Sequence, residues 1–449
     1  MSVTPESLNP ATTPITIAMQ RPAWRDTFSA LRMHNYRIYV IAQFISNTAG
    51  WMQRIAVDWL VLEITGSVAL VGLTIALQFL PTLVLGAFAG VVADRFPKRA
   101  VMITCQAIGV VFSIGLTIVA LSGDAQLWLV YTFVLAIGVA QVFDGPARSV
   151  FVTEMVGPRH LRNAISVNAS IFHLGALLGP AISGALIVAV GSGWAIAVNV
   201  GAGLIGIALL LAIRKRELLV APRARSAKGQ IREAARYIMS KPTLFWTMLM
   251  VGIVAIFGMP MPALLAGMAD SVYLTGATGY GLYNSLAAIG ALTGALVSTR
   301  RASLRLRTII FGAVLYGVLL ALTGFSPFYP MFLVLLITVG LSRLLFMTGA
   351  ETMVQLSSNM AIRGRVMSFW VMVVVGGQAI GGPLMGWIAQ ELGPKNALIV
   401  AGTVPAVAGV AIALVLARSG KLRVAVTPRR GRWVAIVPRP RPAAASATR

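Results

Sequence analysis

The chain is poor in charge, in histidine and in cysteine. Its 449 residues include 13 Asp and Glu, 3 His and 1 Cys, and charged residues of both signs make up only 11%, whereas a typical soluble domain has about a quarter. So few polar side chains cannot cover a water-soluble body. The single cysteine, Cys105, excludes an internal disulfide and a cysteine-rich metal site.

Recognisable chemistry is also missing. The sequence has no GxxxxGK[ST] phosphate loop, so it shows no evident means of using ATP. No catalytic triad and no metal-ligand cluster stand out. The sequence therefore predicts a protein that is not an enzyme and holds no cofactor and no metal.

Long apolar runs dominate what is present. Hydrophobic residues make up 57% of the chain, and the runs are near the ~20 residues that a helix needs to cross a bilayer. Twelve spans are predicted, as six, a long polar break and six more: 36–62, 67–93, 100–121, 127–148, 165–190, 194–213, 244–265, 279–299, 308–325, 328–348, 366–390 and 397–417.

The net charge of +24 is confined to one side of this pattern. With the N-terminus inside, 34 of the 37 Lys and Arg residues fall at the ends of spans or in segments that would be cytoplasmic; only Arg54 and Arg343 lie within spans and Lys395 in an outer loop. Because cytoplasmic loops retain positive charge, both termini are predicted to be cytoplasmic in a multi-pass protein of the cell membrane. This placement argues against nucleic acid as a partner.

These patterns divide the chain into five parts. The central loop is basic, and its section from 230 to 239 has helical composition with a basic and an apolar face, which suits the anionic inner leaflet; a solvated linker is the alternative. The basic, proline-containing tail predicts disorder. The parts are a cytoplasmic N-terminal tail, a six-helix bundle, the central loop, a second six-helix bundle and a cytoplasmic C-terminal tail: 1–35, 36–213, 214–243, 244–417 and 418–449.

The two halves repeat at an offset of 202 residues. Four glycines and a serine of the first half fall on the same residue type in the second half, and most of them lie in spans 5 and 11. Two equal halves with both ends inside indicate a parallel duplication about an axis normal to the membrane. The coincident pairs are Gly138 and Gly340, Ser166 and Ser368, Gly175 and Gly377, Gly179 and Gly381, and Gly184 and Gly386.

A motif in the loop between spans 2 and 3, GVVADRFPKR, carries a family resemblance. It resembles the signature loop of the major facilitator superfamily, although Pro97 stands where that loop usually has glycine. The resemblance implies an all-α membrane protein whose twelve transmembrane helices form two six-helix bundles, the major facilitator fold. The matching residues are Gly90, Asp94, Arg95, Lys98 and Arg99.

The resemblance also implies contacts for these charges. Asp94 ends a helix at the pole where the macrodipole disfavours an anion, and the family pattern places it against the start of span 11. Arg95 or Lys98 would meet Asp144 at the inner end of span 4. These contacts would latch the two halves on the cytoplasmic side. The alternative is that the charges only anchor a short loop by the positive-inside rule.

Small residues and prolines form a second motif in spans 5 and 11. Glycines four apart let helices approach closely, and each proline deletes a backbone donor and permits a bend. The span 5 version resembles the glycine-proline motif of antiporters in the superfamily, with Ser183 and Ser166 as departures from it. General helix packing is the alternative role. The motif residues are Gly175, Gly179, Pro180, Gly184, Gly377, Gly381, Pro383 and Gly386.

Longer strings narrow the resemblance to one branch. The strings are those at 33–67, 78–99, 144–149 and 363–368. They resemble the transmembrane secretion effector branch, which includes enterobactin-type siderophore exporters and macrolide efflux proteins. The likeness extends over about 28–417, and the cargo of one member does not transfer to another.

Polar residues within spans are candidates for function because burying them in lipid is costly. Arg54 and Asp58 are four residues apart on one helix face, where they can pair; Asp58 would take up and release a proton with Arg54 tuning it, or the two would form a permanent ion pair. Arg343 lies too far from Glu351 to pair with it and is a candidate for contacting an anionic cargo. Gln43 and Asn47 share one face of span 1 and are candidates for lining a cavity, although polar groups also join helices.

The sequence predicts a secondary active transporter. Its expected activity is proton-coupled export of an amphipathic small molecule, drug-like or siderophore-like, by alternating access of two bundles. The expected partners are that small molecule, protons and the lipid bilayer, and the expected state is a monomer. Two alternatives stay open: a transporter-like membrane sensor or scaffold, and a proton-coupled uptake carrier.

Overall fold

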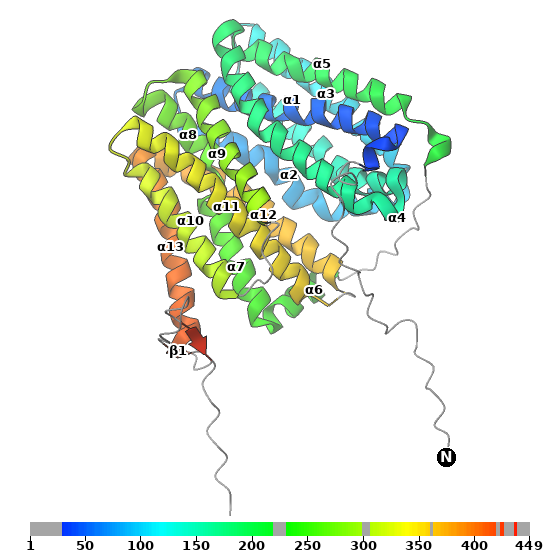
Figure 1. Ribbon diagram of the computed structural model, residues 1–449. Helices are drawn as coiled ribbons and strands as arrows, with labels where there is room; N and C mark the ends of the chain where they lie inside the picture. The colour runs from blue at the N-terminus through cyan, green and yellow to red at the C-terminus, as the bar shows by residue number, and fades with distance from the viewer. Residues whose placement is uncertain are drawn as a thin grey trace, which may run out of the picture.

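The computed structural model describes residues 29–218, 230–298, 306–359, 362–418, 423–425 and 435–437. Almost all of the described chain is helical (Figure 1). The first half contains a short 3-10 helix, five α-helices and a final 3-10 turn. Their bounds are η2 Ser29–Arg32, α1 His34–Thr65, α2 Val68–Arg95, α3 Lys98–Leu121, α4 Leu127–Val190, α5 Ser192–Ala212 and η3 Lys215–Glu217.

The second half contains eight α-helices, one π-helical segment and two short strands. The bounds are α6 Gln230–Ser240, α7 Pro242–Phe257, α8 Met261–Gly267, the π-helix Met268–Val272, α9 Gly276–Ser298, α10 Leu306–Gly324, α11 Tyr329–Ser357, α12 Arg363–Leu392, α13 Pro394–Arg418, β1 Arg423–Ala425 and β2 Ala435–Val437.

Eleven of the helical stretches in the described residues are long and apolar enough to cross a membrane. The twelfth span is α1, whose 32 residues are ample in length but which carries Arg54, Asp58 and Glu63 in its apolar run. These charges explain why α1 differs from the other spans. The structure therefore confirms the predicted all-helical membrane fold with two six-helix bundles, which Figure 1 shows side by side.

Two predicted spans differ in detail from simple helices. The predicted span 244–265 is broken: α7 ends at Phe257, and α8 begins after Pro260. Tyr316 donates a hydrogen bond to the carbonyl oxygen of Gly258 at 2.7 Å and so satisfies the interrupted backbone. By contrast, spans 4 and 5 run on as α4 through a kink at Gly157, whose φ of 65° suits glycine.

The internal repeat is visible in the contacts of the glycine motifs. Gly175 and Gly179 pack on α1 within the first bundle, and Gly377 and Gly381 pack on α7 within the second. The third glycine of each set crosses to the other bundle. A Cβ at Gly184 would lie 2.8 Å from the carbonyl oxygen of Ala277 on α9, and a Cβ at Gly386 would lie 2.8 Å from that of Val68 on α2.

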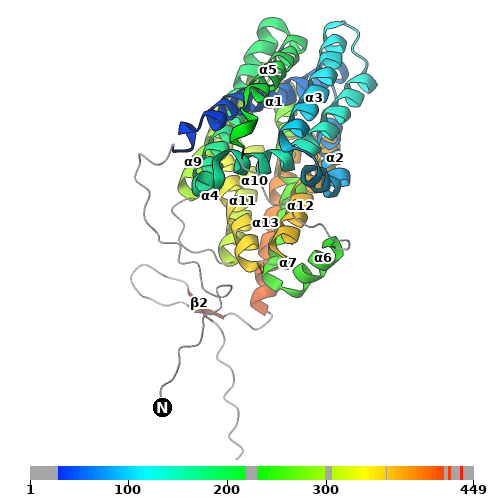
Figure 2. The same ribbon diagram turned by 90° about the vertical axis from the view of Figure 1, so that its right-hand side faces the viewer.

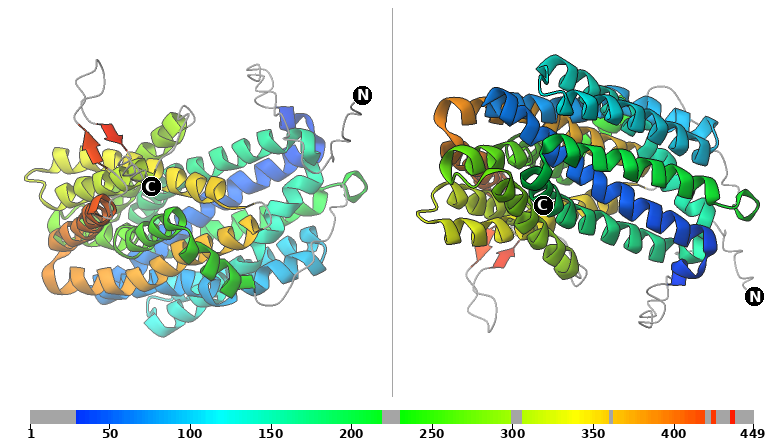
Figure 3. Two further views of the ribbon diagram at one scale, coloured as in Figure 1. Left: turned by 90° about the horizontal axis from the view of Figure 1, so that it is seen from below. Right: turned by 90° about the horizontal axis from the view of Figure 1, so that it is seen from above.

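The bundles accordingly meet along two helix pairs, α2 with α12 and the second span of α4 with α9. We call the end that holds the loop at Arg95–Arg99 and the end of α5 the basic end, and the end that holds the loop at Thr65–Val68 the far end. Figure 3 shows the helices of both bundles lengthwise from two opposite sides.

Segments outside the bundles lie at the basic end. The expected helix at 230–239 is present as α6, which lies beside α7 (Figure 2). Tyr237 of α6 accepts a hydrogen bond from the backbone N–H of Asn359 at 3.1 Å, so α6 is attached to the segment between α11 and α12. In the tail that was expected to be disordered, β1 and β2 pair antiparallel, with Val424 opposite Ile436. The other residues of the tail beyond Arg418 lie outside the described part.

Candidate transport site

A cavity of about 280 Å³ lies inside the first bundle, between α1, α3, α4 and α5. Eleven of its 20 lining residues have amide, hydroxyl or charged side chains. Gln43 and Asn47, the predicted cavity residues, are both in its lining. Sequence reasoning missed most of the other polar residues, although each interrupts an apolar run: Ser46, Gln53, Gln106, Ser113, Gln141 and Arg148.

Three polar side chains join the helices on one wall of the cavity. Gln53 donates to the hydroxyl of Ser113 at 3.0 Å, and Asn199 donates to the side-chain oxygen of Gln53 at 2.6 Å. The trio links α1, α3 and α5. Asn47 likewise joins helices, because its amide nitrogen donates to the carbonyl oxygen of Ile171 at 3.0 Å. Such bonds hold the wall in place because an unsatisfied polar group in lipid is costly.

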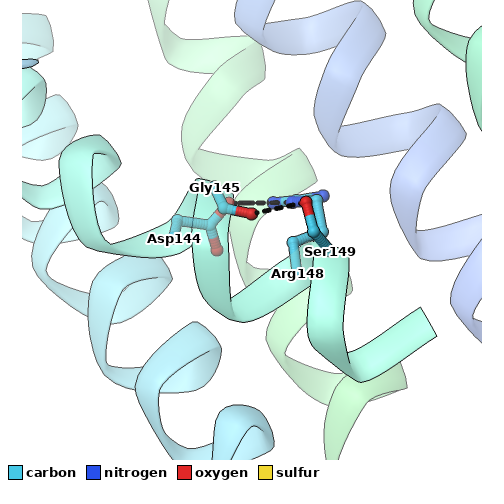
Figure 4. A network of polar contacts seen from close by, with 4 residues as sticks. All are labelled: Asp144, Gly145, Arg148 and Ser149. Atoms are coloured by element: carbon cyan, nitrogen blue, oxygen red, sulfur yellow. Dashed lines mark hydrogen bonds and ion pairs between the residues drawn. The ribbon is translucent and has the colours of Figure 1, made fainter. Parts of the chain in front are cut away.

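A charged pair lies in the part of the cavity wall nearest the basic end. Arg148 donates through Nε to Oδ2 of Asp144 at 2.9 Å, and its terminal nitrogen contacts the same oxygen. The two residues are one turn apart on α4, as Figure 4 shows, with Ser149 donating to the carbonyl oxygen of Gly145 beside them at 3.2 Å. The other carboxylate oxygen of Asp144 is buried without a hydrogen-bond partner among the described residues.

The pair corrects the contact predicted for the signature loop. Asp144 pairs with Arg148 rather than with Arg95 or Lys98, because a partner one helical turn away is already in place. Lys98 instead approaches Glu154, at 4.0 Å between the charged atoms, and Arg95 is exposed. The side chain of Asp94 and the surroundings of Gly90 lie outside the described residues, so the predicted contact of Asp94 with α12 stays a prediction.

The remaining cation of the signature loop has a structural partner. Arg99 donates from Nε to the carbonyl oxygen of Leu210 at 2.8 Å and from a terminal nitrogen to that of Leu211 at 2.7 Å. These carbonyls belong to the last turn of α5, where backbone acceptors lack partners and a cation is favoured. Arg99 therefore caps α5 and joins it to the start of α3.

The predicted pair of Arg54 and Asp58 is not formed. Among the described residues, no acidic side chain lies within the 4.0 Å of an ion pair from Arg54. Its guanidinium carbon instead lies 5.2 Å from the ring centre of Trp51 and 5.5 Å from that of Phe79, a cation–π arrangement. The aromatic neighbours hold the guanidinium at the cavity wall, so Arg54 and Asp58 share a helix without touching.

Asp58 is directed to the interface between the bundles. Its side chain is only 3% exposed. It accepts hydrogen bonds from Gln78 of α2 at 3.3 Å and from the hydroxyl of Tyr280 of α9 at 3.2 Å. The ring of Tyr280 stacks on that of Trp59 with centres 5.9 Å apart. A buried carboxyl group of one bundle thus bonds directly to the other bundle.

A smaller cavity links the two regions. It measures about 40 Å³ and shares Arg54 and Gln141 with the larger cavity, and Gln78, which bonds to Asp58, lies in its wall. Polar groups therefore extend from Asp144 past Arg54 to Gln78 and Asp58.

Hydrogen bonds close the two bundles together toward the far end. Gln390 of α12 accepts from the backbone N–H of Val68 at 2.9 Å and from the hydroxyl of Ser67 at 3.2 Å. Ser285 of α9 donates to the carbonyl oxygen of Leu177 at 3.0 Å. With the Asp58 and Tyr280 bond, these contacts join the two bundles.

Arg343 is placed apart from both cavities. It lies on α11 and is half-buried, and it is close enough to His173 of the first bundle to interact with it electrostatically. Glu351 accepts a hydrogen bond from Gln355 on the same helix at 3.2 Å. Arg343 and Glu351 therefore have separate surroundings, as their spacing predicted.

The fold and this site define a multi-pass membrane transporter with two six-helix bundles of the major facilitator type. The comparison with protein families is specific: residues 25–429 match the model of the transmembrane secretion effector family. The chain belongs to that family, as the resemblance indicated.

Individual relatives agree. The chain is 26% identical over 410 residues to the enterobactin exporter EntS of Shigella boydii serotype 4 (strain Sb227), covering 90% of this chain and 97% of the relative. The EntS of Escherichia coli O1:K1 / APEC has the same identity and coverage. The chain is thus a secondary transporter by family, with exporters among its relatives.

Solved structures share the fold at low identity. A bacterial homologue of the iron transporter ferroportin in the inward-facing state matches with a TM-score of 0.64 and 16% identity, over 85% of this chain and 98% of that one. A POT family transporter in complex with a thioalcohol-conjugated peptide matches with a TM-score of 0.68 and 14% identity, over 85% and 96%.

Proposed function

We propose that this protein exports an amphipathic small molecule in exchange for protons, by alternating access of its two bundles. The observation that carries the proposal is the hydrogen bond between Asp58 and Tyr280, which joins a protonatable group of one bundle to the other bundle. Membership of a family with exporters among its relatives supports the direction.

The coupling would arise from burial. When the far end is closed, Asp58 is shielded from water, and an ionised carboxylate in such surroundings is costly unless it is paired. Opening the far end would separate Tyr280 from Asp58 and hydrate the carboxyl group. Because the two states treat the proton differently, proton binding and bundle movement would be linked. The hydrated, open state would favour the ionised form.

The polar cavity would be the place where the cargo binds. Gln43 and Asn47 lie in its wall, and the contacts of Gln390 and Ser285 toward the far end leave the basic end as the side from which cargo would enter. We place the basic end and both termini in the cytoplasm of a bacterial inner membrane, because that end carries the positive charge. We further propose that a monomer is the working unit, since the cavity is built within one chain.

The test is transport by the purified protein in proteoliposomes with an imposed proton gradient. Asp58→Asn should abolish accumulation against a gradient while leaving exchange of labelled cargo across the membrane largely intact, because only the proton-linked step needs the carboxyl group. Asp124→Asn, an exposed acidic residue at the far end, is the matched control. Unchanged proton-driven accumulation in Asp58→Asn would eliminate the proposed coupling.

The direction of transport is tested in a second experiment, with membrane vesicles of known orientation. Inside-out vesicles, which present the cytoplasmic face outward, should accumulate the cargo when their interior is acidic. Right-side-out vesicles that accumulate it instead would make the protein an uptake carrier.

A further inference from the structure

The internal repeat lets the polar cavity of the first bundle be compared with the second bundle position by position. Gly179 packs against the carbonyl oxygen of Thr48, and Gly381 packs against that of Ile256. Thr48 of α1 therefore corresponds to Ile256 of α7. Similarly, Gly191 and Gly393 precede α5 and α13 with nearly the same backbone angles, φ of 91° and 84°.

Along α1, α4 and α5, these anchors assign counterparts to eight polar residues of the cavity wall. On α7 and α8 the counterparts are apolar, and on α11 and α13 all but one are apolar. The exception is Arg343, the counterpart of Gln141. The other pairs are Ser46 with Val254, Asn47 with Ala255, Gln53 with Met261, Arg54 with Pro262, Asp144 with Phe346, Arg148 with Ala350, and Asn199 with Ala401. One bundle therefore presents polar groups where the other presents apolar ones.

The unused bonding capacity of the cavity indicates what it would bind. Ser46, Gln106 and Asp144 each have a buried side-chain oxygen without a hydrogen-bond partner among the described residues. Two of these oxygens can only accept, so they need donors such as hydroxyl groups. Buried polar atoms of this kind are ordinarily satisfied by a partner, water or ligand.

The cavity lining has an excess positive charge at Arg54, at the end away from Asp144. Its lining holds the cations Arg54 and Arg148 but only one anion, Asp144, which pairs with Arg148. Arg54 makes no hydrogen bond or ion pair with any described residue, and its ring neighbours Trp51 and Phe79 leave its N–H groups available for an anion. A guanidinium suits carboxylate, phosphate or sulfonate oxygens because it can donate two parallel hydrogen bonds.

Size sets a limit on the ligand. Ser46 and Arg54 are eight residues apart on α1, which is about 12 Å along the helix axis. The volume of about 280 Å³ is near the lower limit of pockets that enclose a drug-sized molecule. The cavity has room for a head group but not for a large cargo with its apolar part.

We propose that the cavity of the first bundle binds the head group of an amphipathic anion, with its anionic oxygens on Arg54 and its hydroxyl donors on Ser46, Gln106 and Asp144, while its apolar part lies against the second bundle. This inference names the cargo class of the proposed exporter and so rests on that function. The polar wall of the first bundle would receive the head group, and the apolar wall of the second bundle would receive the apolar part.

The only cysteine of the chain provides a reporter, because Cys105 is in the wall of the cavity. The purified full-length protein is treated with 2-sulfonatoethyl methanethiosulfonate, which is anionic, and with 2-(trimethylammonio)ethyl methanethiosulfonate, which is cationic. In each case the thiolate attacks the reagent and releases methanesulfinate, forming a mixed disulfide. The ratio of the two rates, divided by the ratio for free 2-mercaptoethanol, cancels the ionisation of the thiol.

The normalised ratio should favour the anionic reagent by about threefold or more, because an unpaired cation acts strongly in such a poorly hydrated site. Arg54→Gln should bring the ratio close to one, and Arg307→Gln, at an exposed site on α10, should leave it unchanged. A ratio that shows no anion preference in the wild-type protein, or one that Arg54→Gln leaves intact, would overturn the proposal.

A cavity-filling variant tests the location separately. A Cβ at Gly109, in the cavity wall, would meet nothing within 4 Å, and the same holds for Gly201 on the outer surface of α5. Gly109→Leu should slow the reaction of Cys105 with both reagents, whereas Gly201→Leu should not. Equal rates in both variants would mean that the reagents reach Cys105 by another route and would contradict the assignment.

Protection then tests the amphipathic part. 8-Anilinonaphthalene-1-sulfonate should slow the reaction of Cys105 with the neutral reagent methyl methanethiosulfonate, and N-phenyl-1-naphthylamine, which has the same rings without the sulfonate, should not. Equal protection by both, or by neither, would overturn the inference. None of these reactions needs a proton gradient, so a protein that fails proton-driven transport can still pass them, and a protein that exports normally can fail them.

Discussion

Gln390 accepts a hydrogen bond from the backbone N–H of Val68, although the two residues belong to different bundles. Val68 is the first residue of α2, and the N–H groups of a first helical turn have no partner within the helix. The second bundle therefore completes a helix cap of the first. A cap of this kind exists only while the far end is closed, so it stabilises the closed state selectively.

Removing this cap should loosen the far end. Gln390→Ala should cost the closed state about 1 kcal/mol, as the loss of a helix cap typically does, and so raise the open fraction about fivefold. The measurement is the distance distribution between spin labels at Asp124→Cys and Leu274→Cys, both exposed at the far end, in a Cys105→Ser background. Gln126→Ala is the control, because the side chain of Gln126 accepts a hydrogen bond from Trp128 within its own bundle. An unchanged distribution in Gln390→Ala would show that the cap has no part in closure.

The close approach of α12 to α2 gives a second prediction. Gly386→Leu should prevent closure of the far end, because even a Cβ would lie 2.8 Å from the carbonyl oxygen of Val68, and overpacking of this kind typically costs about 1–3 kcal/mol. Gly364→Leu on the same helix should be tolerated, since a Cβ there meets nothing within 4 Å. The same spin-label pair should report a longer distance for Gly386→Leu only. Normal closure in Gly386→Leu would contradict the packing described here.

The hydroxyl of Tyr280 gives a third prediction. Tyr280→Phe should keep the stack on Trp59 but lose the bond to Asp58, at a cost of about 1–3 kcal/mol for a buried group left without its hydrogen-bond partner. We expect proton-driven transport to fall more than downhill transport, because the linkage between the bundles is weakened. Tyr283→Phe on the same helix removes bonds to Thr275 and Tyr329, both within its own bundle, and should affect the two modes equally. The ratio of the two transport rates in proteoliposomes is the readout, and equal ratios in both variants would argue against a coupling role.

Arg99 gives a prediction about stability. Arg99→Ala should free the last carbonyls of α5 and raise amide hydrogen exchange in its final turn, by an amount that corresponds to about 1–3 kcal/mol for two charge-assisted bonds. Arg95→Ala removes an exposed cation of the same loop and should leave that exchange unchanged. Exchange followed by mass spectrometry would distinguish the two, and equal protection would mean that Arg99 does not cap the helix.

Arg343 gives a prediction about cargo. If it contacts anionic cargo across from the first bundle, Arg343→Ala should lower transport of anionic substrates by roughly tenfold, as expected for one lost charged contact, and leave neutral ones unaffected. Transport of a matched anionic and neutral pair by the same protein preparation is the measurement. An equal loss for both substrates would indicate a structural role for Arg343 instead.

Some parts of the site could be predicted from sequence and others could not. Gln43 and Asn47 were predicted to face a cavity because they share one face of a helix, and both lie in its wall. For Arg54 and Asp58 the sequence left two alternatives, a proton-binding Asp58 tuned by Arg54 and a permanent ion pair. The ion pair is not formed, because Trp51 and Phe79 hold the guanidinium elsewhere, and the first alternative stays a prediction.

The break between α7 and α8 could have been predicted from the sequence, because helix-breaking residues mark it. Gly258, Pro260 and Pro262 interrupt the apolar run, and a proline removes a backbone donor. Tyr316 stabilises the break from a distant helix, and its position along the sequence does not reveal this. For Lys98 the expected partner was Asp144, and only the path of α4 in the tertiary structure brings Glu154 to it instead.

The sequence by itself determined the number of spans and their approximate positions, their division into two repeats and the end at which positive charge collects. These are local properties, because in lipid each helix must satisfy its own backbone bonds and match the bilayer in length. Only the tertiary structure decided which side chains meet: Asp58 with Tyr280, Gln390 with Val68, and the polar wall assembled from α1, α3, α4 and α5. Those contacts depend on how helices far apart in the chain rotate and tilt against one another, and no pattern within a single helix encodes that.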